Sequence, residues 1–175
     1  MEAPSLRGTK VRIDRFTAVD IGDDYIGWLN DPAVTRFSNQ RFRAHDRASC
    51  EAYVASFEGS ANLFLAVRRL DDSKLIGTMT AYRSVPHGTV DVGIMIGDPE
   101  TWGGGFGQDA WNLVIDWLAS QPDIRKVTAG TLACNRGMVR LMERSGMIFD
   151  GARRAQEMVE GEPQDVVYYA RFADR

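Results

Sequence analysis

The chain has 175 residues and a mass of 19.5 kDa, which is the size of one ordinary domain. Its content of 44% hydrophobic and 26% charged residues excludes a disordered chain. The net charge of −3 and the isoelectric point near 5.4 exclude the basic surface that a nucleic-acid-binding domain carries. We therefore expect a single domain over residues 1–175 without a nucleic-acid partner.

The sequence also shows no pattern typical of a targeting segment or of a disulfide cross-link. Residues 1–16 contain no long apolar run, so we expect neither a secretory signal nor a membrane span, and hence a cytoplasmic protein without a membrane partner. Cys50 and Cys134 are the only cysteines and form no CxxC pair. We therefore expect two reduced thiols, with no disulfide framework and no metal site.

The first half of the chain shows both strand and helix periodicity. Apolar alternation predicts strands over 10–17, 62–70 and 74–85, the last two joined as a hairpin by Asp-Asp-Ser. Apolar residues at helical spacing predict helices over 18–31 and 44–60, and an Asp-Pro pair ends the first of them.

The second half continues the mixture and decides the fold class. The predicted order is β-α-α-β-β-β-α-β-α-β-β, with one strand-helix-strand crossover in a largely antiparallel arrangement. This order indicates an α/β or α+β fold with a mixed sheet. The elements are a strand over 89–97, a helix from Gly105, a strand over 126–135, a helix over 136–146, and two strands around a turn at 160–165.

The strand over 89–97 has two unlike faces. One face carries four β-branched side chains, whereas the other is nearly bare because two of its four residues are glycine. A bare face fits a strand against which something packs closely, either a ligand or a helix. The two faces are Val90, Val92, Ile94 and Ile96, and Asp91, Gly93, Met95 and Gly97.

Four glycines then open the next helix: Gly103, Gly104, Gly105 and Gly107. Because glycines have no Cβ atoms, a ligand can come close to this loop, and the unpaired amides of residues 105–108 would point at it. A phosphate is the ligand that such amides favour. A flexible turn is the alternative. Residues 105–110 match the dinucleotide fingerprint, but not at the first turn of a repeated βαβ sheet, and the P-loop lysine is missing.

The pattern W-G-x-G-F-G-Q-D-A, with the preceding strand and the segment 126–147, resembles the acetyl-CoA-binding core of the GNAT acyltransferase superfamily. The resemblance covers residues 10–172. It is strongest to the acetylases of ribosomal-protein N-termini and their relatives that acetylate amino-sugar nucleotides. It implies a mixed, mostly antiparallel sheet of about seven strands, flanked by helices and splayed at the acetyl-CoA site.

The family's pyrophosphate loop, Q/R-x-x-G-x-G/A, falls on residues 102–107, with Trp102 where Arg or Gln often stands. The resemblance implies that main-chain groups of the strand over 89–97 bind the pantetheine arm and the thioester carbonyl. Many relatives protonate the departing thiolate with a Tyr, where this chain has Met142. The implied cofactor-binding residues are Ile94, Met95, Ile96, Trp102, Gly103, Gly104, Gly105, Phe106, Gly107, Gln108, Asn135, Met138, Met142 and Arg144.

Two residues are candidates for the chemistry itself. Asp91 is the first candidate for the base, because relatives often carry an acid there; its alternative is a solvated strand residue. We expect Asn135 either to bind the pantetheine or to cap the following helix.

The remaining polar residues have other expected roles. We expect Arg140 and Arg144 either to reach a phosphate of the cofactor or to form a solvated face of the helix. The histidines, His45 and His87, read as surface or helix-start residues rather than bases.

The acceptor site should be formed by the first two helices, their connection and the last hairpin. Arg36, Arg41, Arg43 and His45 stand among phenylalanines in that connection. They would bind an amine that carries a phosphate and a base that stacks on the phenylalanines, or alternatively they would hold a loop in place.

Together these features lead to one expectation, with alternatives. We expect an acetyl-CoA-dependent N-acetyltransferase that acts by direct transfer on a small amine such as an amino-sugar nucleotide. The alternatives are an acetylase of a protein N-terminus, such as that of a ribosomal protein, and a non-catalytic acyl-CoA sensor. A route through an acetylated Cys134 is a further alternative, and the family resemblance favours a homodimer.

Overall fold

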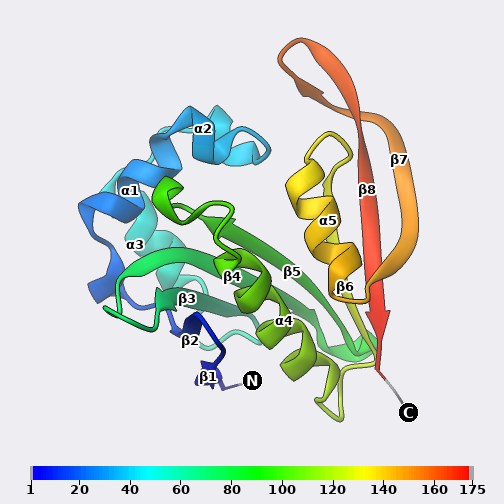
Figure 1. Cartoon of the computed structure of the whole chain (residues 1–175), viewed down its shortest axis with the longest axis horizontal. Helices are drawn as coiled ribbons and strands as arrows, with labels where there is room; N and C mark the ends of the chain where they lie inside the picture. The colour runs from blue at the N-terminus through cyan, green and yellow to red at the C-terminus, as the bar shows by residue number, and fades with distance from the viewer. Residues whose placement is uncertain (1, 174–175) are drawn as a thin grey trace.

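The computed structural model describes residues 2–173, and its strands form one eight-stranded sheet in the order β1-β2-β3-β4-β5-β6-β8-β7 (Figure 1). Neighbouring strands are antiparallel except β5 and β6, which are parallel and joined by a crossover through α4. The mixed, mostly antiparallel sheet is therefore confirmed. The strands are β1 Leu6–Arg7, β2 Val11–Arg15, β3 Leu63–Arg69, β4 Leu75–Ser84, β5 Thr89–Ile96, β6 Lys126–Leu132, β7 Ile148–Val159 and β8 Glu162–Phe172.

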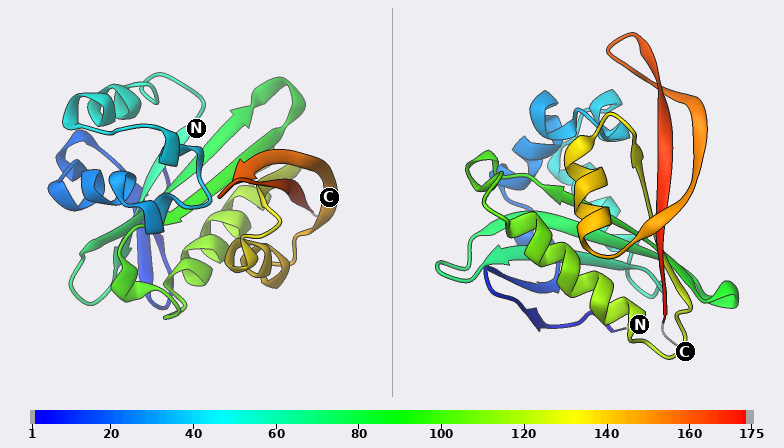
Figure 2. Two further views of the ribbon diagram at one scale, coloured as in Figure 1. Left: turned by 90° about the horizontal axis from the view of Figure 1, so that it is seen from above. Right: turned by 45° about the vertical axis from the view of Figure 1, so that its right-hand side comes forward.

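Helices cover both faces of this sheet (Figure 2). On one face, α4 buries Trp111, Ile115 and Leu118 completely. On the other face, α1 and α3 enclose an aromatic cluster in which the rings of Phe16 and Tyr25 lie 4.8 Å apart. The helices are α1 Asp23–Asn30, α2 Pro32–Thr35, α3 Arg47–Ala55, α4 Phe106–Ala119 and α5 Arg136–Arg144, with 3-10 turns at Ala18–Asp20, Asn39–Phe42, Val85–His87 and Pro99–Thr101.

The structure differs from the prediction between the first two predicted helices. Asp31 ends α1 and also caps α2, because its side chain accepts a hydrogen bond from the N–H of Ala33 at 2.8 Å. Pro32 occupies the first position of α2, where a helix needs no N–H donor. The Asp-Pro pair that predicts a helix end therefore also begins a second helix. The structure also adds β1, whose two residues are too few to show alternation.

The turn of the last hairpin is shorter than predicted. The connection is the pair Glu160 and Gly161, which have φ values of 52° and 87°. Two consecutive residues with positive φ form the tight turn that matches the twist of a hairpin. Pro163, which suggested a longer turn, lies within β8 opposite Met158 on β7. The hairpin therefore extends as a long arm beyond the rest of the sheet (Figure 1).

Asp109 fastens the first turn of α4 to the neighbouring β1–β2 turn. Its carboxylate accepts hydrogen bonds from the N–H groups of Thr9, Lys10 and Val11 at 3.3, 2.8 and 3.0 Å. Burial alone would raise the pKa of Asp109, but these amides outweigh burial and lower it. A Cβ on Gly8 would lie 2.5 Å from the carboxylate, so the turn needs glycine there to wrap around it.

We expect Asp109→Ala to lower the free energy of unfolding by about 1–2 kcal/mol at pH 7, because several backbone donors lose a charged partner and most of them are solvent-exposed. The folded-state pKa is lowered, so this stabilisation is present above the unfolded-state value of about 3.9 and is lost as the pH falls through the folded-state pKa. Urea denaturation at pH 7 and at acidic pH measures both effects.

Asp116→Ala is the matched control, since Asp116 lies on the same helix and forms an exposed ion pair with Arg171. Its effect should stay within about 0.5 kcal/mol. Equal losses for the two variants would contradict an anchoring role for Asp109.

Candidate active site

A V-shaped opening divides the middle of the sheet. β5 and β6 pair only over Thr89–Asp91 and Lys126–Thr128. Beyond that point β5 stays paired with β4 as far as Ile96, while β6 stays paired with β8 as far as Leu132 (Figure 1). The free edges of β5 and β6 therefore diverge, as the splayed strands of the prediction require. Main-chain groups along this edge of β5 are available to a ligand.

The glycine loop lies at the end of this opening. Gly105 caps α4 with a φ of 81°, a left-handed conformation that favours glycine. The N–H groups of residues 105–108 have no hydrogen-bond acceptor among residues 2–173. Trp102 donates its indole N–H to the carbonyl of Ile96 at 2.8 Å, and a Cβ on Gly107 would lie 3.3 Å from the Ile96 side chain. The loop is thus fixed against the end of β5, with its amides free.

The residues on the bare face of β5 have two different kinds of neighbour. A Cβ on Gly97 would lie 2.1 Å from the Trp28 ring, so the helix contact, one of the two alternatives, holds at that residue. Gly93 and Met95 instead line a cavity. The ligand alternative therefore remains at the middle of the strand.

This cavity, which we call the tyrosine chamber, has a volume of about 260 Å³. It lies between β4, β5 and the helices α1 and α3, and is lined by Tyr25, Tyr53 and Tyr82 together with Gly93 and Met95. The hydroxyls of Tyr53 and Tyr82 are hydrogen-bonded at 2.7 Å, and burial raises the pKa of Tyr25 and of Tyr53. Every lining side chain is uncharged.

Sequence reasoning missed the tyrosine chamber. Tyr25 and Tyr53 fall at helical spacing and therefore looked like ordinary core residues. Tyr82 looked like part of a regular strand. No local signal joins these three positions.

Asp91 lies at the closed end of the V. It is the last residue of β5 that pairs with β6, and its carboxylate accepts a hydrogen bond from the hydroxyl of Thr128 at 2.9 Å. Tyr82 stands directly opposite it on β4, on the face of the tyrosine chamber. The side chain remains exposed, yet surrounding protein reduces its hydration and raises its pKa, an effect that the Thr128 hydrogen bond opposes. A carboxylate with a raised pKa is a stronger base.

A family model described as an acetyltransferase (GNAT) domain matches residues 10–148. This chain belongs to the GNAT acetyltransferase family. No curated protein matches the sequence significantly.

Solved structures agree with the GNAT fold. The ribosomal-protein-S5-alanine acetyltransferase from Vibrio fischeri is 15% identical, with a TM-score of 0.82 over 98% of this chain and 97% of that one. The spermidine N-acetyltransferase from Vibrio cholerae, in complex with CoA and spermine, is 18% identical, with a TM-score of 0.81 over 93% and 95%. The microcin C7 self-immunity acetyltransferase, in complex with acetyl-CoA and AMP, is 13% identical, with a TM-score of 0.78 over 93% and 92%. At these identities the likeness establishes the fold.

In this GNAT chain, the residues expected on α5 have separate structural roles. Asn135 caps the helix by accepting from the N–H of Met138 at 3.3 Å, and donates to the Thr131 hydroxyl. Met138 is half-buried against the core. Met142 is fully buried, so it presents no surface to a cofactor, and its expected direct contact is not supported. Asn135 thus caps α5, and its expected contact with the pantetheine stays a prediction.

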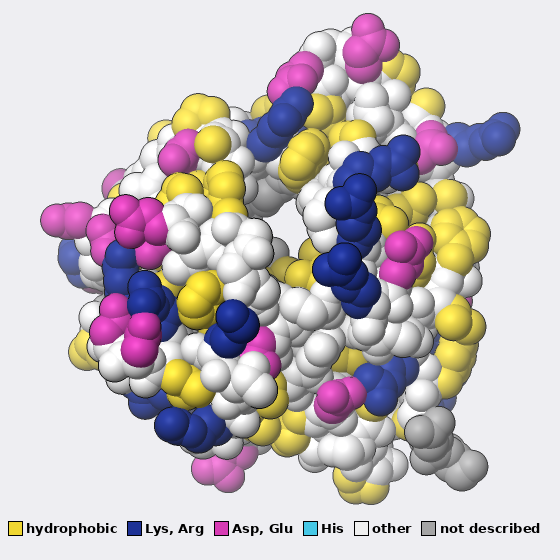
Figure 3. Space-filling model, in the orientation of Figure 1, with side chains coloured by type: hydrophobic (Ala, Val, Ile, Leu, Met, Phe, Trp, Pro, Cys, Tyr) yellow, Lys and Arg dark blue, Asp and Glu magenta, His cyan; other side chains and the backbone are white. Residues whose placement is uncertain are grey.

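The outer face of α5 is a basic ridge. Arg136, Arg140 and Arg144 follow one another at intervals of four residues and are all exposed. Figure 3 shows Lys and Arg side chains in a column over this helix, beside the hollow between α5 and the β5 side of the molecule. None of the three has an ion-pair partner among residues 2–173. They remain available to phosphate groups.

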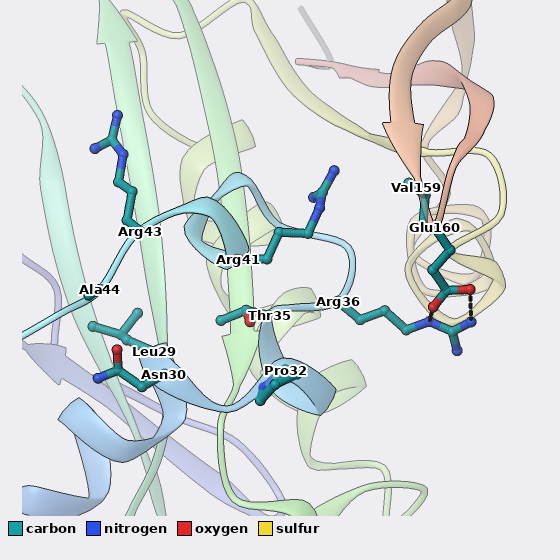
Figure 4. A pocket seen from close by; sticks show the side chains of 10 residues that line it. All are labelled: Leu29, Asn30, Pro32, Thr35, Arg36, Arg41, Arg43, Ala44, Val159 and Glu160. Carbon is teal, nitrogen blue, oxygen red and sulfur yellow. Dashed lines mark hydrogen bonds and ion pairs between the residues drawn. The ribbon is translucent and has the colours of Figure 1, made fainter.

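The four expected acceptor residues fall into two pairs, and Figure 4 shows the three arginines among them. Arg36 makes a two-fold hydrogen bond with Glu160, at 3.0 and 3.1 Å, and Arg41 donates to the carbonyl of Met158 at 3.0 Å. Both arginines therefore connect the α2 segment to the tip of the β7–β8 hairpin, which is the loop-holding alternative. Arg43 and His45 make no such contact and line a neighbouring cavity.

The hairpin contact is reinforced by packing. Phe37 packs against a small core cluster formed by Leu132, Val159 and Val166. Because Leu132 belongs to β6 and Phe37 follows α2, this contact joins the α2 segment to β6 and to the β7–β8 hairpin. Glu160 was not expected in the site, since it lies 124 residues from Arg36 in the sequence.

The remaining features carry no assigned role. Cys50 is buried and Cys134 half-buried, both as free thiols, and burial raises the pKa of Cys50. Within residues 2–173, no three His, Cys, Asp or Glu side chains gather as they would around a metal ion. No helix in the same range is long and apolar enough to cross a membrane.

Proposed function

We propose that this protein transfers the acetyl group of acetyl-CoA directly to a primary amine of a small molecule. The observation that carries the proposal is the row of free amides at residues 105–108, beside the gap between β5 and β6. A helix N-terminus with unpaired amides suits a pyrophosphate. An unpaired strand edge suits an amide-rich arm such as pantetheine.

The donor would lie across the α4 and α5 side of the V. Its pyrophosphate would sit on residues 103–108, next to Trp102, and its remaining phosphate near Arg140 and Arg144 on the basic ridge. Its pantetheine arm and thioester carbonyl would bind main-chain groups of Ile94–Ile96. Hydrogen bonds from fixed backbone groups would polarise the carbonyl without reorganising during the reaction.

The amine would approach from the tyrosine chamber on the opposite face. An uncharged chamber disfavours the ammonium form, so it helps to supply the neutral amine that attack requires. The nitrogen would form a bond to the carbonyl carbon, Asp91 would accept the amine proton, directly or through one water, and the C–S bond would break. CoA would leave as the thiolate, stabilised by solvent and the nearby helix end, since Met142 replaces a proton donor. Asn135 would act as a positioning residue through the cap of α5.

The acceptor that we propose is a small phosphorylated amine, such as an amino-sugar nucleotide. Arginine and histidine side chains beside the chamber support this choice over a protein N-terminus. A second class of function, acyl-CoA sensing without turnover, would use the same loop.

Two measurements test the proposal. The melting temperature should rise with acetyl-CoA and CoA but not with NAD, by about 5–10 °C at a ligand concentration near 100 times Kd. Release of CoA thiol with a panel of amines then separates an enzyme from a sensor. The absence of a melting shift at millimolar acetyl-CoA would overturn the proposal, and a shift without turnover would favour the sensor.

A further inference from the structure

The tyrosine chamber is the first of three adjoining cavities. Tyr25, Leu29 and Tyr53 line both the chamber and a second cavity of about 180 Å³. Leu29 and Arg43 line both this second cavity and the cavity of about 340 Å³ in Figure 4. Adjoining cavities therefore lie in a row from the middle of β5, past the tyrosines, to Arg43.

The charged side chain of Arg43 lies only in the outer cavities of this row. The chamber has no charged lining residue, whereas the second cavity is lined by Arg43 and His45. The Arg43 guanidinium makes no hydrogen bond or ion pair within the part of the chain that the structure describes. In the same range, Nε2 of His45 is buried without a hydrogen-bond partner. A buried polar atom without a partner is unfavourable, so turning this ring to bring Nε2 to a ligand group would be favourable.

The other two arginines do not compete for this role. Arg36 is held by Glu160, and Arg41 by the Met158 carbonyl and by Glu157 at 3.9 Å. Figure 4 shows the Arg36 side chain directed to Glu160, while the Arg43 side chain points elsewhere. Only Arg43, of these three, combines a free guanidinium with a position on two of the cavities.

We propose that the acceptor amine carries an anionic group, a carboxylate or a phosphate, that binds at Arg43 and His45 while its amine enters the tyrosine chamber. The inference rests on the proposed acetyl transfer and assigns the site that binds the anionic group of its acceptor. Guanidinium groups bind these anions with two parallel hydrogen bonds. A polyamine would instead bring a second ammonium group toward the Arg43 guanidinium, which repels it, so this site disfavours a polyamine.

Matched pairs of amines test the substrate class. Tyramine and O-phosphotyramine, and glucosamine and glucosamine 6-phosphate, differ only in the phosphate; spermidine serves as the polyamine. We expect kcat/KM to be about 10- to 100-fold higher for at least one phosphorylated member than for its parent. A hydrogen bond to a charged group contributes enough free energy for a factor of this size. A preference for spermidine or for both parent amines would overturn the inference.

Variants locate the preference. Arg43→Ala should remove most of the advantage of the phosphorylated amine. Arg47→Ala is the control, because Arg47 is an exposed arginine on α3 that pairs with Glu51 and lines none of the three cavities. It should retain the advantage. An unchanged preference in Arg43→Ala would overturn the assignment to Arg43.

Measurements of amine binding test this inference independently of the proposed reaction. If no amine releases CoA thiol, the proposed function fails. The anion site is then judged from the melting temperature of the CoA-saturated protein, which should rise with O-phosphotyramine, not with tyramine, and not in Arg43→Ala. Equal melting temperatures with O-phosphotyramine and tyramine would overturn the anion site as well.

Discussion

Asp91→Asn is expected to lower kcat for acetyl transfer by about 100-fold or more, the usual contribution of a general base. Asparagine keeps the size of the side chain and an oxygen that accepts from Thr128, but it cannot take the amine proton. The affinity for CoA should not change, because the free amides of the glycine loop lie at the opposite end of β5 from Asp91. Steady-state rates and calorimetric titration with CoA measure the two effects.

The pH profile identifies the role of the carboxylate more directly. Reduced hydration raises the pKa of Asp91 above its ordinary value, and activity requires the ionised form, so the wild-type rate should fall as the pH decreases through that pKa. Thr128→Val removes the hydrogen bond that opposes this rise and should move the acidic limb to higher pH. The protonation of the amine affects all variants equally. An Asp91→Asn enzyme with the wild-type rate and profile would show that the proton leaves by another route.

Local patterns predicted the parts of the site that are built from neighbouring residues. The glycines of residues 103–107 lie together in the sequence, and the backbone conformation that they permit follows from the lack of a Cβ atom. The alternation in β5 likewise predicted its two faces, because side-chain direction in a strand has a period of two. The divergence of β5 and β6 depends on the registers of four strands, and only the family resemblance indicated it.

Long-range partners account for what the sequence could not provide. The pattern grouped Arg36, Arg41 and Arg43 as equivalents, but two of them are paired with the β7–β8 hairpin, more than 110 residues away. The tyrosine chamber has the same cause, since it combines residues from α1, α3 and β4. Which charged residues remain free is therefore a property of the tertiary structure.

Gly105→Val is expected to raise Kd for CoA by about 10- to 100-fold. Gly105 has a φ of 81°, and its nearest neighbour to an added Cβ is Lys10 at 3.6 Å, so the obstacle is backbone conformation rather than space. A β-branched residue in the left-handed region is strained by roughly 1–2 kcal/mol or more. The loop should relax and turn the amides of residues 106–108 away from the pyrophosphate. Losing one or two charged hydrogen bonds gives the expected factor.

Gly59→Val separates this effect from a general loss of stability. Gly59 also has a positive φ, of 67°, with nothing within 4 Å of an added Cβ, and it lies between α3 and β3, away from the loop. Both variants should melt at lower temperature than the wild type, because both carry the same backbone strain. Titration with CoA should then weaken only for Gly105→Val. Equal affinity in the two variants would mean that the pyrophosphate does not rest on these amides, and the donor site would have to be sought along the basic ridge of α5 instead.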